Sequence, residues 1–196
     1  FYCFAFRKEV KMKIWSSEHI FNHSWESVVK AALKKYPNPQ NPSVIGVDVV
    51  ERCVDPATRV IRSHRLLAST WNIPGCIASV LGGNRVCYAS EHSRLDVQRR
   101  EMSMRTRNLT LNNVIQIEEE LTYSVHPECP ERTLLRQEAQ ITVKNVPLIA
   151  YIETLIFNTI NSNAQKSRLA IEYIIHKMND LGDQVSANLT KNASSS

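Results

Sequence analysis

The stretch that decides the fold is the last long apolar one, residues 147–182, PLIAYIETLIFNTINSNAQKSRLAIEYIIHKMNDLG. Its apolar residues recur every three or four positions, which predicts one amphipathic helix beginning at Pro147 and ending at Gly182. The predicted face consists of Leu148, Ile149, Ile152, Leu155, Ile156, Ile160, Ala170, Ile174, Met178 and Leu181. At ~1.5 Å per residue this helix is about 50 Å long, so a broad surface must lie beneath it.

Polar residues interrupt this apolar face halfway along the helix. At ~100° per residue, the side chains that project into the apolar sector are those of Thr159, Asn163, Lys166 and Ser167. An ammonium buried without a partner is strongly unfavourable, so Lys166 would need an anion, a carboxylate or water in the interior. The alternative is that the helix overhangs the core there and Lys166 extends to solvent.

The chain before this helix predicts seven strands and one short helix. The strands are expected at 13–21, 45–53, 59–70, 85–95, 99–111, 114–125 and 133–145. The short helix begins after a Ser24 cap and ends by Tyr36, because Pro37 and Pro39 forbid its continuation. Short turns between consecutive strands favour antiparallel pairing. We therefore predict an α+β fold, in which a curved seven-stranded antiparallel sheet is covered by the long C-terminal helix around an elongated interior.

Two features within the predicted sheet are ambiguous. Arg62, His64 and Arg65 place positive charge on the third strand, and we expect these side chains on the solvent side. After that strand comes an apolar segment that ends at a pair of glycines, with bulky residues at Trp71, Ile73, Pro74, Ile77 and Leu81. It is consistent with a short core helix and equally with a mobile flap that bends at its proline and glycines.

Length and composition indicate one domain and argue against several classes of function. The 196 residues carry a net charge of +5, without the basic runs of a nucleic-acid-binding surface. The five cysteines lack the spacing of a zinc site or a disulfide framework, and no cofactor motif occurs. We expect residues 1–11 to be a dispensable extension, 12–182 to form the domain and 183–196 to be a disordered tail.

Catalytic motifs are also absent from the sequence. Phosphate-binding loops, nucleophile elbows and HExxH do not occur, and His19 with His23 does not form a metal-binding pair. Glu119 shares a strand face with Ile117 and Leu121. It fits either a catalytic acid or a core carboxylate that is neutral or salt-bridged. The sequence offers no positive sign of an enzyme.

Several short segments resemble the PRELI/MSF1 domain, and in particular its slowmo branch. They are 12–21 (MKIWSSEHIF), 35–39 (KYPNP), 47–49 (VDV), 63–67 (SHRLL) and 166–168 (KSR). The resemblance implies a lipid-transfer fold with a lid, and a carrier that moves phospholipids between the outer and inner mitochondrial membranes. It further implies a small helical twin-CX9C partner in the intermembrane space, transient contact with membrane surfaces, and phosphatidylserine as the lipid of the slowmo branch.

The same resemblance implies a set of site residues. The head group would be bound by Lys35, Ser69, Thr159, Asn163 and Lys166, and the lid would be the segment containing Trp71, Ile73, Pro74, Ile77 and Leu81. Ser69 and Thr159 stand where the phosphatidic-acid carriers have lysines. The loss of two positive charges favours phosphatidylserine over phosphatidic acid. Phosphatidic acid transfer, and a non-catalytic adaptor that binds lipid, are the alternatives.

Overall fold

The computed structural model describes residues 12–71, 86–144 and 149–193 of the chain. In chain order the elements are β1 (Met12–Phe21), α1 (Trp25–Lys34), β2 (Val44–Val54), β3 (Val60–Thr70), β4 (Val86–Asp96), β5 (Glu101–Asn108), β6 (Ile115–Val125), β7 (Thr133–Val143) and α3 (Ile149–Ala193). The predicted α+β class is confirmed, and each predicted strand is present with similar bounds.

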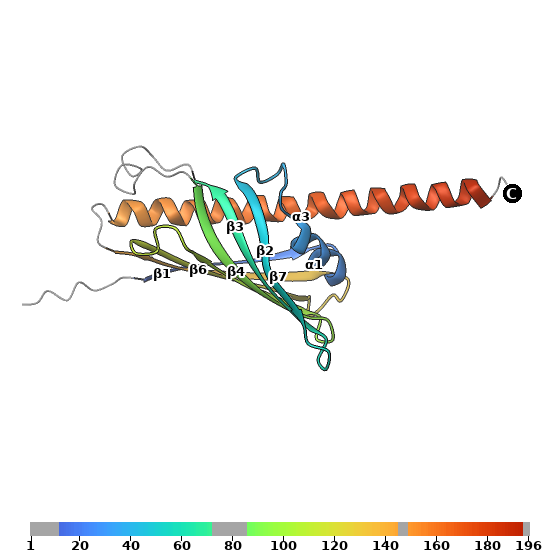
Figure 1. Cartoon of the computed structure of the whole chain (residues 1–196), viewed down its shortest axis with the longest axis horizontal. Helices are drawn as coiled ribbons and strands as arrows, with labels where there is room; N and C mark the ends of the chain where they lie inside the picture. Colours follow the sequence, from blue (N-terminus) through green and yellow to red (C-terminus); the bar gives the residue numbers. More distant parts are fainter. Residues whose placement is uncertain (1–11, 72–85, 145–148, 194–196) are drawn as a thin grey trace, which may run out of the picture.

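The strands form one antiparallel sheet with the order β1-β7-β6-β5-β4-β3-β2. Strands β2 to β7 are neighbours in chain order, whereas β1 pairs with the last strand, from Met12 opposite Thr142 to Phe21 opposite Thr133. The two edges of the sheet are therefore β1 and β2. Figure 1 shows the sheet curving beneath α3, which crosses its open side and continues beyond it.

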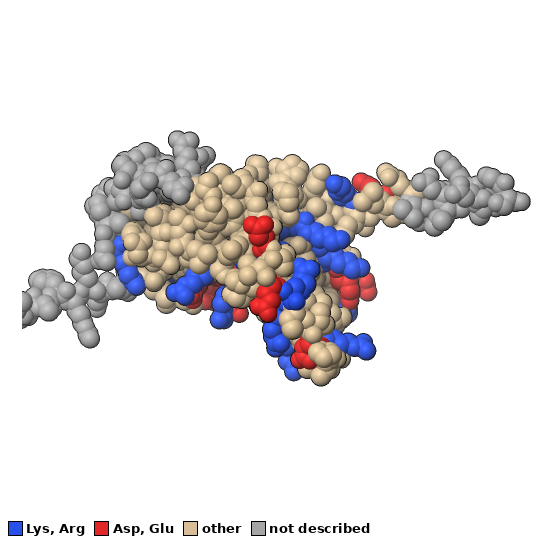
Figure 2. All heavy atoms as spheres, in the orientation of Figure 1, with Lys and Arg blue, Asp and Glu red and all other residues tan. Residues whose placement is uncertain are grey.

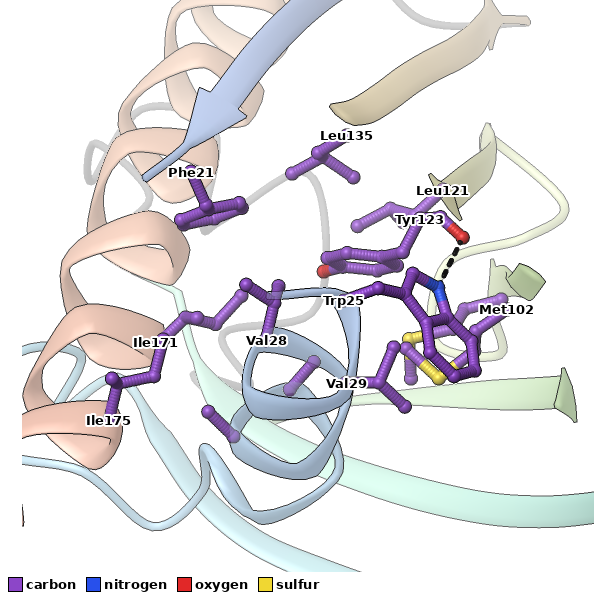
Figure 3. Close-up of a cluster of buried hydrophobic side chains, with 13 residues drawn as sticks. Phe21, Trp25, Val28, Val29, Met102, Leu121, Tyr123, Leu135, Ile171 and Ile175 are labelled. Atoms are coloured by element: carbon purple, nitrogen blue, oxygen red, sulfur yellow. Dashed lines mark hydrogen bonds between the residues drawn. The ribbon is translucent and has the colours of Figure 1, made fainter. Parts of the chain in front are cut away.

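One hydrophobic cluster holds α1 between the sheet and α3 (Figure 3). The Ser24 hydroxyl caps α1 by accepting a hydrogen bond from the backbone N–H of Ser27 at 3.4 Å. Trp25 packs into the cluster, and its indole N–H donates to the carbonyl oxygen of Tyr123 at 3.1 Å. Ile171 of α3 is fully buried against this group. The cluster thus fixes both helices over one end of the sheet.

A second cluster fixes the first half of α3 over the other end of the sheet. Ile152 and Ile156 of α3 are buried against Trp15 of β1 and Ile115 of β6. The polar residues in the middle of α3 lie between the two clusters. Both ends of the covered sheet are therefore packed, and the polar segment crosses the space between them.

The second half of α3 differs from the prediction in two ways. The helix continues past Gly182 to Ala193, so its predicted end is wrong, and residues 183–193 are helical where a disordered tail was expected. A glycine inside a helix costs only about 1 kcal/mol, and no proline follows it. Ile171 and Ile175 are buried because this part of α3 packs against α1, whereas Leu181, farther along the helix, is 53% exposed. Among the described residues, no helix is both long and apolar enough to span a membrane.

Charged side chains on the face shown in Figure 2 are mixed rather than sorted by sign. Lys and Arg gather toward the part of the molecule where α1 lies, and Asp and Glu lie among them. Arg100 forms an ion pair with Glu26 of α1 at 2.9 Å. The net charge of +5 therefore produces no continuous basic surface on this face.

Candidate functional site

A cavity of about 760 Å³ lies between the concave face of the sheet and α3. Alternation along β3 to β6 turns every second side chain toward it. Apolar atoms make up most of the surface of its wall, and the apolar side chains that line it include Leu67, Met104, Leu111, Ile115, Ile117, Leu121, Leu155, Ile156 and Ile160. This volume falls within the ~300–1,000 Å³ typical of small-molecule sites.

The structure brings the predicted head-group residues together around this one cavity. Its lining includes Lys35, Ser69, Thr159, Asn163 and Lys166. Lys35 follows α1, Ser69 lies near the end of β3, and the others lie on the middle of α3. Residues separated by more than 130 positions in the sequence, such as Lys35 and Lys166, thus line the same cavity.

The predicted lid is only partly visible in the structure. Trp71 lines the cavity at the end of β3 and packs beside the second hydrophobic cluster. Ile73, Pro74, Ile77 and Leu81 lie outside the described residues. The lid therefore stays a prediction for all five residues.

Lys35 is the most deeply placed cation of the cavity, with 6% of its surface exposed. Its Nζ donates a hydrogen bond to Ser167 Oγ at 3.0 Å and lies 5.1 Å from the centroid of the Tyr36 ring. Burial by itself lowers the pKa of Lys35, but nearby groups that ionise as anions, including Tyr123 and Glu91, outweigh it and raise the pKa overall. Lys35 therefore carries its charge at neutral pH.

Arg65 is buried behind the cavity-lining Glu91 rather than exposed on the solvent side, which corrects the prediction. Glu91 lies opposite it on β4, also buried, and the two form an ion pair in which Arg65 Nε donates at 2.8 Å and Nη2 donates as well. Arg65 Nη1 also donates to the carbonyl oxygen of Leu33 at 3.1 Å. The pair thus ties the C-terminal end of α1 to the sheet. Sequence reasoning missed Glu91, whose only signal is that it faces Arg65 across two adjacent strands.

Glu119 projects from β6 into the same cavity, on the face that alternation predicted. Gln137 Nε2 donates a hydrogen bond to Glu119 Oε1 at 2.6 Å, and no ion-pair partner occurs in the described part of the chain. Burial raises the pKa of Glu119, while the Gln137 hydrogen bond and the charge of Lys35 act against this rise. Glu119 is therefore a hydrogen-bonded carboxyl on a cavity wall, where the sequence had left a catalytic acid and a core carboxylate open.

Lys166 is partly buried and lines the cavity. Its ammonium forms no hydrogen bond and no ion pair with the described residues. Thr159, two turns earlier on the helix, donates its hydroxyl to the carbonyl oxygen of Leu155 at 2.8 Å, which leaves its lone pairs available. The middle of α3 therefore offers the cavity a cation and hydroxyl and amide groups.

The arrangement suits an amphiphilic ligand with a charged end. Apolar walls can enclose hydrocarbon, while Lys35 and Lys166 can bind an anionic group with charge-assisted hydrogen bonds. Within the described ranges, no three His, Cys, Asp or Glu side chains are placed to hold a metal ion.

Comparisons with known proteins agree with this description. A family model for the PRELI-like family matches residues 26–181. The chain is 29% identical to a protein slowmo homolog of Dictyostelium discoideum, over 89% of this chain and 76% of that protein. It is 32% identical to protein UPS2, mitochondrial, of Saccharomyces cerevisiae, over 84% of this chain and 73% of that protein.

A solved structure shares the fold at much lower identity. The Zhui aromatase/cyclase from Streptomyces sp. R1128 superposes with a TM-score of 0.59 at 12% identity, covering 85% of this chain and 95% of that one. At this identity the likeness concerns the fold alone: a curved sheet closed by a long helix.

Proposed function

Since the chain belongs to the PRELI-like family, we propose that it is a carrier that transfers a phospholipid, phosphatidylserine, between the outer and inner mitochondrial membranes. The observation that carries this proposal is the cavity, which has apolar walls and places two lysines near the middle of α3. A carrier of this kind makes and breaks no covalent bond. It needs only to shield an acyl chain from water and to recognise the head group.

The apolar walls supply the first requirement. Each methylene removed from water contributes ~0.8 kcal/mol, so even part of one acyl chain in the cavity would be held firmly. The same energy has to be returned when the lipid leaves at the acceptor membrane. Opening of the segment after Trp71 and desolvation of the lipid should therefore set the rate of transfer.

The polar groups supply the second requirement. Lys35 is already held by Ser167, whereas Lys166 is available to a phosphate or carboxylate. A hydrogen bond to such a charged group contributes about 1.5–3 kcal/mol. The hydroxyls of Ser69 and Thr159 and the amide of Asn163 suit the polar serine moiety, which needs more donors and acceptors and less positive charge than a phosphate monoester.

Location and partner belong to the same proposal. UPS2, a relative at 32% identity, is named as a mitochondrial protein, which supports a mitochondrial location. We place the chain in the intermembrane space, in complex with a small helical twin-CX9C protein, on the family resemblance of the segments 12–21 and 35–39. In this setting it makes transient contact with the two facing membranes.

Transfer between liposomes tests the function. Donor vesicles carry fluorescent phosphatidylserine, and Lys166→Glu is compared with the wild type and with Lys177→Glu, an exposed lysine of the same helix. The reversed charge at 166 repels the anionic head group, so we expect at least a tenfold slower transfer, while Lys177→Glu transfers normally. Equal rates for the two variants would show that the head group does not bind at Lys166. Wild-type protein without transfer activity would overturn the proposal.

A further inference from the structure

The cavity contains a carboxyl group, that of Glu119, which has no evident use if the ligand is only an anion. Glu119 lines the same space as Lys35 and Lys166, and a carboxylate there weakens the attraction for a phosphate. Burial of a charged group is unfavourable unless the group is paired. A carboxylate in this position therefore requires a structural partner or a role toward the ligand.

The neighbouring Glu91 shows what a structural carboxylate looks like in this site. It is 5% exposed and receives two hydrogen bonds from the Arg65 guanidinium. Glu119 differs, because its one hydrogen bond in the described part of the chain comes from a neutral amide, Gln137 Nε2, at Oε1. Its Oε2 is not sealed among protein atoms. Glu119 thus lines the cavity with one oxygen held by Gln137 and the other without a hydrogen bond among the described residues.

Taking the proposed function as its basis, the geometry points to Glu119 as a specificity-determining residue: its free carboxylate oxygen accepts a hydrogen bond from the ammonium of an amino-bearing phospholipid head group. Lys35 and Lys166 bind the anionic part of the same head group. Lys35 and Glu119 both line the cavity, so the ligand meets groups of opposite charge in one space. A zwitterionic serine moiety, with its ammonium beside its phosphate and carboxylate, matches that arrangement.

The negative charge of Glu119 would let the cavity distinguish phosphatidylserine from phosphatidic acid. A phosphatidic acid offers no ammonium, and its phosphate is repelled by the ionised carboxylate. Glu119 therefore weakens the binding of phosphatidic acid, whereas it strengthens the binding of phosphatidylserine. Selectivity then depends on the difference between the two interactions.

Glu119→Gln tests the inference with little change of shape, because the amide oxygen can still accept from Gln137. Donor liposomes contain equal amounts of phosphatidylserine and phosphatidic acid, and the transfer of each is measured in the same reaction. We expect the ratio of phosphatidylserine to phosphatidic acid transferred to fall about tenfold, equivalent to ~1.4 kcal/mol. The matched control is Glu118→Gln, on the same strand and exposed beside Arg107, which should leave the ratio unchanged.

A change on the lipid side tests the same contact without a variant. Phosphatidylserine with an acetylated amine keeps its phosphate and carboxylate but loses the ammonium. The wild type should transfer it about tenfold more slowly than phosphatidylserine, and Glu119→Gln should transfer the two lipids at similar rates.

The outcomes separate this inference from the function on which it rests. If Glu119→Gln still transfers phosphatidylserine with the wild-type ratio, or slows both lipids equally, the inference is wrong and the carrier function stands. If the wild type does not distinguish the acetylated lipid, the inference is likewise wrong. A wild type that transfers neither lipid overturns the proposed function, and the inference with it.

Discussion

Glu91→Gln tests the buried ion pair that ties α1 to the sheet beside the cavity. Both partners are buried, with 6% of Arg65 and 5% of Glu91 exposed, so the change leaves a guanidinium in the interior without its counter-charge. Removing one partner of such a pair costs about 3–5 kcal/mol. The introduced amide oxygen still accepts one hydrogen bond, so we expect the lower end of this range. For a chain of this length that corresponds to a thermal midpoint roughly 6–12 °C lower.

Circular dichroism during heating at neutral pH measures this shift. Glu118→Gln is the control, because it removes an exposed pair with Arg107, N to O 3.3 Å, and should cost less than about 1 kcal/mol. Arg65→Met combined with Glu91→Leu removes both charges and should recover most of the lost stability. If Glu91→Gln lowers the thermal midpoint no more than the Glu118→Gln control does, the guanidinium of Arg65 does not depend on Glu91 for its stabilisation, and the expected cost is wrong.

Three further predictions concern stability. Because burial raises the pKa of Glu119 in the folded chain, its ionised form opposes folding, and Glu119→Gln should raise the thermal midpoint at neutral pH. This gain in the midpoint should vanish below about pH 4, where the carboxyl is protonated in both the folded and the unfolded chain. A gain that persists in acid would contradict this. Ile171→Ala should cost about 2–5 kcal/mol in urea unfolding, whereas Leu169→Ala, 56% exposed, should change stability by less than about 0.5 kcal/mol. Trp25→Phe loses the hydrogen bond to Tyr123 and should cost about 1 kcal/mol or more in the same assay; an unchanged midpoint would argue against that bond.

The elements of the sheet could be predicted because their signal is local. Alternation of apolar and polar residues placed each strand, and Pro37 and Pro39 marked the end of α1. The same alternation assigned Glu119 to the face of Ile117 and Leu121, where the structure has it. These inferences depend only on residues a few positions apart.

The errors occur where distant parts of the chain decide the outcome. Arg65 was expected in solvent because arginine usually lies there, and only the pairing of β3 with β4 places Glu91 against it. The buried face of α3 turns toward Ile171 and Ile175 because α1 packs there, which periodicity in α3 alone does not reveal. Pairing of β1 with β7 is likewise set by contacts between the two ends of the chain.

The candidate site shows the same division between local and distant information. Lys166 stood out because a cation interrupted an apolar helix face, and the family resemblance added Lys35 and Ser69. Gln137 was missed, because a glutamine on a strand has no distinguishing pattern. Its role becomes visible only when β7 places its amide against Glu119.

Native mass spectrometry of the gently extracted protein shows whether the cavity carries a lipid, because it weighs the chain together with whatever the cavity holds. We expect a mass increase equal to one phospholipid per chain, identified by fragmentation as phosphatidylserine, and its loss in Lys166→Glu but not in Lys177→Glu. A chain that stays lipid-free, even after incubation with vesicles containing phosphatidylserine, would contradict the claim that the space beneath α3 carries a lipid.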